Sequence, residues 1–138
     1  MTTITALLSR NAPRQSIHRG ESYFRDGAVG QLVRRGNELE ADVEGTEPDP
    51  YRIWVLFEEE EVIDAGCTCP YDHGGWCKHI VATLLAYDQH PGQVLLRPPV
   101  AEQLAALDRA QLQALLLELV DQTPRLNEMI ETILDSLT

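Results

Sequence analysis

The residues best suited to chemistry lie in one thirteen-residue stretch, which holds all three cysteines and two of the four histidines. Three thiolates and one imidazole can fill the tetrahedral shell of Zn²⁺, which takes sulfur at about 2.3 Å and nitrogen at about 2.0–2.1 Å. The candidate ligands are Cys67, Cys69, Cys77 and His79. Their arrangement in two close pairs predicts one zinc ion per chain.

The local sequence suits each pair to a metal. Cys67 and Cys69 are two residues apart, so on an extended backbone both side chains leave the same face. The apolar run at 80–87 predicts a helix, which places Cys77 just before the first turn and His79 within it. The free N–H groups and the positive dipole end of a helix start favour a thiolate there.

Other uses of these residues stay open. His73 could replace His79 as a ligand, although its glycine-rich surroundings favour a solvated role. The cysteines could instead hold an iron–sulfur cluster or act in redox chemistry. A zinc hydrolase or deaminase would use three protein ligands and a carboxylate, and Asp72 is the only carboxylate in the stretch. Four protein ligands leave no open position, so the sequence favours a structural centre.

The elements that must position these residues predict an α+β fold. An N-terminal helix is expected over 13–26, with Gly27 placed to end it. Alternating apolar residues and turn signals predict strands at 29–35, 38–44, 51–57 and 62–65. The result is a small antiparallel sheet of about four strands, with helices on one face and the last strand leading to Cys67.

The C-terminal part reads as a separate helical appendage. Prolines bracket an expected linker at 91–100, and leucines recur at helical spacing beyond it. Asp108 and Gln111 form a capping-box pattern, and Thr123–Pro124 is typical of the start of a final helix. The sequence therefore predicts a zinc-binding domain over 1–90 and a helical hairpin over 101–138.

Charge is distributed unevenly along the chain, whose net charge is −11. Residues 1–36 carry +4, residues 37–64 carry −10, residues 65–100 are neutral and residues 101–138 carry −5. A strongly acidic protein repels nucleic-acid phosphates, whose neutralisation by Lys and Arg provides most non-specific affinity. DNA contact is therefore expected only from the basic residues, namely Arg19, Arg25, Arg34, Arg35 and Lys78.

The pattern C-x-C, seven residues, then C-x-H resembles the SWIM zinc finger. The sub-patterns Cys67-Thr68-Cys69-Pro70 and Cys77-Lys78-His79 are typical of that family, and residues 19–29 resemble the lead-in of small bacterial members. The resemblance covers roughly residues 19 to 87. It implies four zinc ligands and a module that binds DNA or other proteins, often beside transposases, kinases or Swi/Snf-type ATPases, none of which this sequence contains.

These observations predict a non-enzymatic, zinc-binding interaction module. We expect a protein partner rather than DNA, because of the net charge, and self-association through the C-terminal helices is a further expectation. No apolar run approaches the roughly 20 residues that span a bilayer, so no membrane role is expected. Three clustered cysteines argue against a disulfide framework and favour a reducing cytoplasm.

Overall fold

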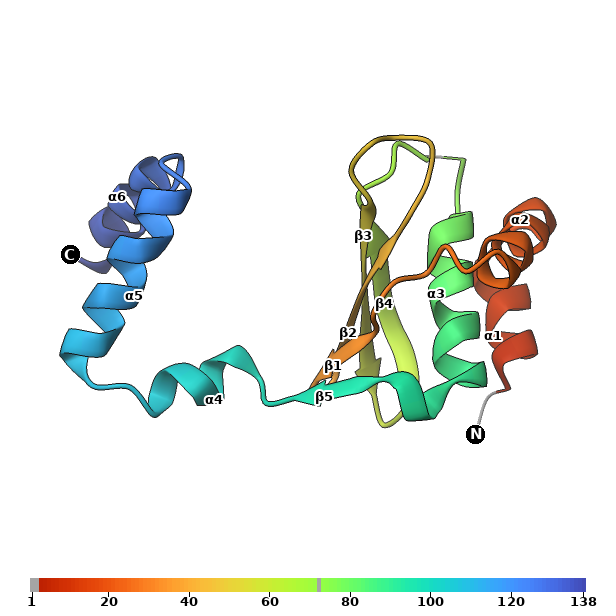
Figure 1. The fold of residues 1–138 in the computed structure, drawn as a ribbon, viewed down its shortest axis with the longest axis horizontal. Coiled ribbons are helices and arrows are strands. Elements are labelled where there is room, and N and C mark those ends of the chain that lie inside the picture. Colours follow the sequence, from red (N-terminus) through yellow and green to blue (C-terminus); the bar gives the residue numbers. More distant parts are fainter. Residues whose placement is uncertain (1–2, 72) are drawn as a thin grey trace. The chain divides into compact units, whose positions relative to one another are not determined.

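The computed structural model describes residues 3–71 and 73–138, which form two compact units. One unit ends at Pro98, and the other runs from Pro99 to Thr138. Figure 1 shows that the first unit combines helices with a sheet and that the second is helical. The predicted α+β class is therefore confirmed.

The first unit contains the elements α1 (Ile4–Asn11), α2 (Arg14–Arg25), β1 (Val33–Arg35), β2 (Glu38–Val43), β3 (Tyr51–Glu58), β4 (Glu61–Cys67), α3 (Lys78–Gln89), η1 (Pro91–Gln93) and β5 (Leu95–Arg97). Its sheet has five strands in the order β4-β3-β2-β1-β5. The first four form the expected antiparallel meander, in which β2 and β3 pair from Glu38 opposite Leu56 to Val43 opposite Tyr51.

The predicted strand count was one too low. Leu95–Arg97, which the sequence places in a linker, pairs in parallel with β1 as a fifth strand. Three residues between proline-rich segments carry too little periodicity to be recognised as a strand. The strand forms because α3 returns the chain to the open edge of β1, where the N–H of Leu95 donates to the carbonyl of Leu32.

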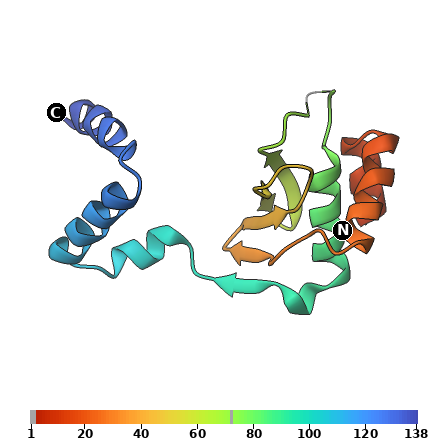
Figure 2. The ribbon, with the colours of Figure 1, turned by 45° about the horizontal axis from the view of Figure 1, so that its top comes forward.

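Helix α3 is the central layer of the first unit. Figure 2 shows it between the sheet on one side and α1 with α2 on the other. Inward residues of β2 and β3 meet its apolar face in one core, which includes the fully buried Leu39, Val55 and Leu84. Gly20 lets α2 approach closely, because a Cβ there would lie 2.4 Å from Cγ1 of Val81.

The second unit consists of α4 (Val100–Ala105), α5 (Arg109–Gln122) and α6 (Leu126–Leu137). The capping box at the start of α5 is confirmed: the Gln111 N–H donates to Asp108 Oδ1 at 2.8 Å, and the Asp108 N–H donates to Gln111 Oε1 at 3.0 Å. Helix α6 begins at Leu126, slightly later than the Thr123–Pro124 pattern indicates. None of the helices in the described residues is long and apolar enough to cross a bilayer.

Candidate metal centre

The four predicted ligands converge at the end of the first unit where β4 stops and α3 starts. The ligand atoms of Cys67, Cys69, Cys77 and His79 all lie within 4.8 Å of one another. The two pairs come from segments ten residues apart in sequence, so the fold, and not local spacing alone, brings them together.

The geometry of these atoms fits one zinc ion. Nδ1 of His79 lies 3.7 Å from Sγ of Cys67 and 3.7 Å from Sγ of Cys77. A tetrahedral zinc with the usual bond lengths separates nitrogen and sulfur ligands by about 3.5 Å. Nδ1 of His79 and these two sulfurs therefore already lie within a few tenths of an ångström of the separation that zinc requires.

Strand β4 fixes the first pair of cysteines. Cys67 is the last residue of β4 and lies opposite Ile53 of β3. The next residue prolongs the pairing, since the Thr68 N–H donates to the Arg52 carbonyl at 3.1 Å and the Arg52 N–H donates to Thr68 Oγ1 at 3.0 Å. These bonds prolong the pairing of β4 with β3 by one residue, but the chain then bends at Thr68 and Cys69, so the extended backbone expected from the two-residue spacing ends at Cys67.

Helix α3 and a glycine turn fix the second pair. Cys77 is the N-cap of α3 and His79 its second residue, as the sequence predicts. Gly75 has a φ of +72°, and a Cβ there would lie 2.7 Å from the Asn11 carbonyl oxygen. The Trp76 N–H donates to that same carbonyl at 2.8 Å, so the turn is tied to the end of α1.

The thiols differ in acidity because they are hydrogen-bonded to one another. The Cys67 thiol donates to the Cys77 sulfur, which lowers the pKa of Cys77 to about 4, with His79 and the Ile80 N–H acting in the same direction. The same bond raises the pKa of Cys67, and burial raises that of Cys69. The lowered pKa of Cys77 and its position at the positive end of the helix both favour the thiolate form, which is the form that binds a metal.

Aromatic rings set the orientation of His79. The residue is 3% exposed, and its ring lies 4.6 Å from that of Tyr51 and 5.3 Å, edge-on, from that of Tyr23. Its Nε2 is buried, without a hydrogen-bond partner among the described residues. A buried Nε2 held between rings leaves Nδ1 as the nitrogen that faces the sulfurs. The two tyrosines are a part of the site that the ligand pattern in the sequence does not reveal.

Two of the predicted basic residues lie beside this centre. A cavity of about 500 Å³ is lined by Arg19 and Lys78 together with Cys69, Cys77 and His79. Lys78 Nζ lies 4.9 Å from the centre of the Tyr23 ring. His73 also lines the cavity but is exposed and outside the four-residue cluster, and Asp72 lies outside the described residues.

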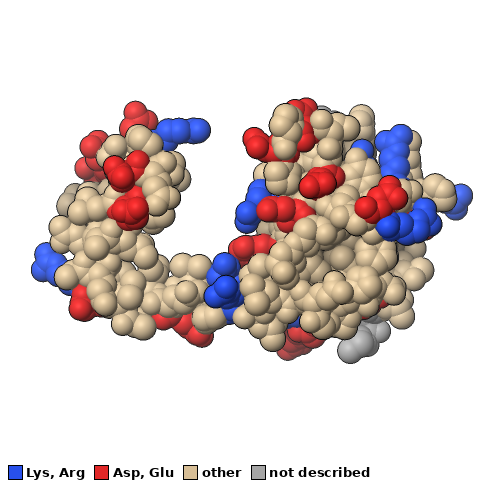
Figure 3. Space-filling model, in the orientation of Figure 1, with Lys and Arg blue, Asp and Glu red and all other residues tan. Residues whose placement is uncertain are grey.

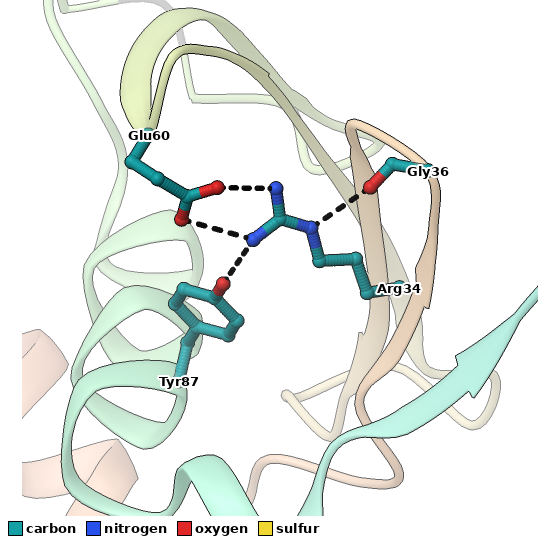
Figure 4. Close-up of polar contacts among 4 residues, drawn as sticks. All are labelled: Arg34, Gly36, Glu60 and Tyr87. Carbon is teal, nitrogen blue, oxygen red and sulfur yellow. Dashed lines mark hydrogen bonds and ion pairs between the residues drawn. The ribbon is translucent and has the colours of Figure 1, made fainter.

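The other predicted basic residues lie elsewhere. Arg34 points inward from β1 and makes a bidentate ion pair with Glu60, at 2.9 and 3.2 Å, while also bonding to Tyr87 and to the Gly36 carbonyl (Figure 4). Tyr87 is nine residues, or about 14 Å, along α3 from Lys78, so Arg34 bonds to the end of that helix away from the metal centre. Arg35 lies 3.7 Å from Glu40.

The Arg34 network secures the turn between β3 and β4, which the predicted strands place at 58–61 but whose backbone conformation they do not indicate. Glu59 and Glu60 connect β3 to β4 with φ values of 51° and 67°, a conformation that normally selects Asn or Gly. Arg34 raises the stability of this turn by pairing with Glu60 and lying 4.7 Å from the centre of the Phe57 ring.

Arg25, the remaining predicted basic residue, lies at the end of α2, where its guanidinium donates to the Ser22 hydroxyl at 3.3 Å.

Comparison with known proteins gives one consistent result. The family model described as SWIM zinc finger matches residues 51–88. The zinc finger SWIM domain-containing protein 8 homolog of Drosophila melanogaster is 34% identical over 116 residues, and zinc finger SWIM domain-containing protein 8 of Homo sapiens is 33% identical over 119. Each alignment covers 83% of this chain but only 6% of the relative. No solved structure matches the chain.

The similarity reaches beyond the metal centre. The alignment leaves only about a sixth of the chain uncovered. Wherever the alignment begins along the chain, it must therefore include the start of α5. Parts of both units are therefore shared with these much longer relatives, which are named for a domain and not for a reaction.

Proposed function

Residues 51–88 of this chain form a SWIM zinc finger, and from this we propose that the protein is a non-enzymatic module that uses structural zinc to support contacts with other proteins. The convergence of Cys67, Cys69, Cys77 and His79 carries the proposal. Four protein donors satisfy tetrahedral zinc, so water or substrate has no position at which to bind.

A closed centre can be distinguished from a catalytic one by replacing zinc with cobalt. The visible spectrum of Co²⁺ reports its ligands, so the replaced protein should show a tetrahedral, thiolate-rich spectrum. Adding azide or phosphate should leave that spectrum unchanged, because no position is open. A spectral change on adding either anion would contradict the non-enzymatic assignment. His73→Ala is the matched control, since its spectrum should equal that of the unaltered chain.

In this proposal zinc acts by stabilising the folded state of the first unit. Structural zinc contributes about 10–16 kcal/mol of apparent binding free energy in small fingers, whereas a whole domain is typically stable by about 5–15 kcal/mol. The metal joins β4 to α3, and these elements flank the core of the first unit. Because thiolate ligands must stay reduced, we place the protein in a reducing compartment, the cytoplasm.

The open face of the sheet supports a protein partner. Trp54 and Leu56 point outward from β3 and are 40% and 39% exposed, and nearby Ile63 is 55% exposed. The Trp54 ring lies over Gly66, where a Cβ would be 2.0 Å from the ring, so the indole is held flat against the sheet. Exposed aromatic residues of this kind are enriched at protein interfaces.

Cross-linking in cells tests the choice of partner. Proteins joined to the zinc-loaded chain should be recovered after nuclease treatment, and they should be lost with Trp54→Ala or Cys77→Ser. Arg97→Ala, at an exposed position on β5, is the matched surface control and should leave recovery unchanged. Recovery that depends on intact nucleic acid would overturn the protein assignment.

DNA binding is the second candidate function, because Arg19 and Lys78 lie together at the metal end of α3. Figure 3 shows basic side chains on the α1–α2 side of the first unit, and acidic side chains with some basic ones among them over its strands. Duplex affinity would fall with salt at a slope of about −0.9 per phosphate contacted. We expect weak binding at about 0.15 M salt. Sub-micromolar binding that is lost in Arg19→Ala with Lys78→Ala would favour DNA instead.

A further inference from the structure

The second unit consists of helices that do not enclose a buried hydrophobic core of their own. No side chain described in residues 99–138 is buried. Helices α5 and α6 have 14 and 12 residues, lengths at which isolated helices are marginal in water. Units of about 40 residues usually need a disulfide, a metal or another chain, and this segment contains no cysteine. A further apolar surface must therefore cover it.

The uncovered surface is large and apolar. On α5 and α6 the large hydrophobic residues that are 38–76% exposed are Leu115, Leu116, Leu117, Leu119, Met129, Ile133, Leu134 and Leu137. Those of α6 recur at the spacing of one helix face, together with the partly buried Leu126 and Ile130. The contact between α5 and α6 thus leaves most of the stripe open.

The charges of α6 lie away from this stripe. At 100° per residue, Glu128, Glu131 and Asp135 fall on the side of the helix opposite the apolar face. The residues bordering the stripe are Asn127, Thr132 and Ser136, all uncharged. Both hydroxyls bond to carbonyls of their own helix, at 2.9 and 2.6 Å, so these borders need no polar partner.

Helix α5 is divided less sharply, since Arg109 falls on its apolar side and Leu117 falls outside that side. Its stripe is bordered by Gln111, Gln113 and Gln122, while Glu118 and Asp121 lie toward the opposite side. Gln122 bonds to Glu118 at 2.9 Å. Apart from Glu118, whose carboxylate already accepts from Gln122, a basic partner would find no carboxylate along these borders. A second identical hairpin would meet glutamine, asparagine and hydroxyls, so two acidic chains can associate without placing carboxylates against each other.

We propose that α5 and α6 are the surface through which two copies of this chain associate. A two-fold axis would pair each stripe with its copy and convert two hairpins into a four-helix bundle, the simplest closed arrangement of antiparallel helices. This inference goes beyond the proposed function of the zinc finger, because the surface lies outside residues 51–88. It concerns the second unit alone.

Sedimentation equilibrium of the full, zinc-loaded chain tests the proposal directly. The mass should approach two chains between the low micromolar range and about 100 µM. Ile133→Asp with Leu137→Asp should give one chain. Ile63→Asp, which removes an equally exposed apolar residue from the sheet face, is the matched control and should stay dimeric. Raising the salt concentration should weaken the dimer little, because the stripe and its borders carry few charges.

Hydrogen exchange provides a test that needs no variant. Amides of α5 and α6 should become more protected as protein concentration rises, whereas amides of the first unit should not change. A single-chain mass at about 100 µM would overturn the proposal. So would a dimer lost in Ile63→Asp but kept in the double variant, or an assembly larger than two. Zinc content, measured on the same samples, reports separately on the finger.

Discussion

The two units of this chain are stabilised in different ways. The first unit has a closed core of strands and helices, and the four candidate ligands join the end of β4 to the start of α3. The second has well-capped helices and an open apolar stripe. The difference shows that helical periodicity in the sequence is enough to specify helices. A unique packed structure needs, in addition, further layers of secondary structure, a metal or another chain.

The largest expected effect is loss of a single ligand. Replacing Cys77 with Ser should abolish tight zinc binding and unfold the first unit, because the metal contributes as much free energy as the whole domain retains. The helices of the second unit should keep their signal in circular dichroism. Elemental analysis gives the metal content. A His73→Ala variant that lost zinc would move the fourth ligand from His79 to His73.

Filling the contact between α2 and α3 should have a smaller effect. Gly20→Ala places a Cβ 2.4 Å from Val81 and 2.9 Å from the Lys78 carbonyl, so we expect a loss of about 1–3 kcal/mol. Urea unfolding monitored by the tryptophans of the first unit measures it. Gly92→Ala, where nothing lies within 4 Å, is the control. Equal midpoints for the two variants would show that the α2–α3 contact is not tight.

Removing the capping box should affect only the second unit. Asp108→Ala removes the acceptor for the Gln111 N–H and should cost about 0.5–2 kcal/mol of helix stability. Amide exchange in α5 should accelerate while zinc content stays at one per chain. Slower folding or metal loss in the first unit would indicate that the two units are energetically coupled.

The smallest effect concerns the β3–β4 turn. The hydrogen bond from Arg34 lowers the pKa of Glu60 below its usual 4.5. A carboxyl with a lowered folded pKa stabilises the protein above its unfolded pKa and loses that contribution as pH falls through the folded value. The stability difference between the unaltered chain and Glu60→Gln should therefore be full near pH 7 and vanish in acid. A difference independent of pH would contradict the ion pair.

The sequence predicted the site more completely than the fold around it. The ligand cluster and the N-cap position of Cys77 follow from residue types and spacing, which local chemistry determines. The capping box at Asp108 could be predicted from the sequence for the same reason. The strand Leu95–Arg97 could not be predicted, because a three-residue strand forms only where another strand offers a free edge.

Contacts between residues far apart along the chain could not be predicted from the sequence either. Arg34 was grouped with the basic residues expected to contact DNA, but it binds Glu60 and Tyr87, which are 26 and 53 residues away in sequence. A turn between the strands at 51–57 and 62–65 was expected, but its positive φ values at Glu59 and Glu60 were not, because neither residue is Gly or Asn. The placement of Tyr23 and Tyr51 around His79 likewise depends on how α2 and β3 meet α3.

The most direct test of this account is amide hydrogen exchange of the full chain before and after zinc is removed by a chelator. If zinc holds the first unit together, protection should fall across the strands and across α1, α2 and α3, with α5 and α6 unchanged at constant protein concentration. Uniform loss of protection along the chain would contradict the division into a metal-dependent and a metal-independent unit. Full retention in the strands would show that zinc does not stabilise the fold.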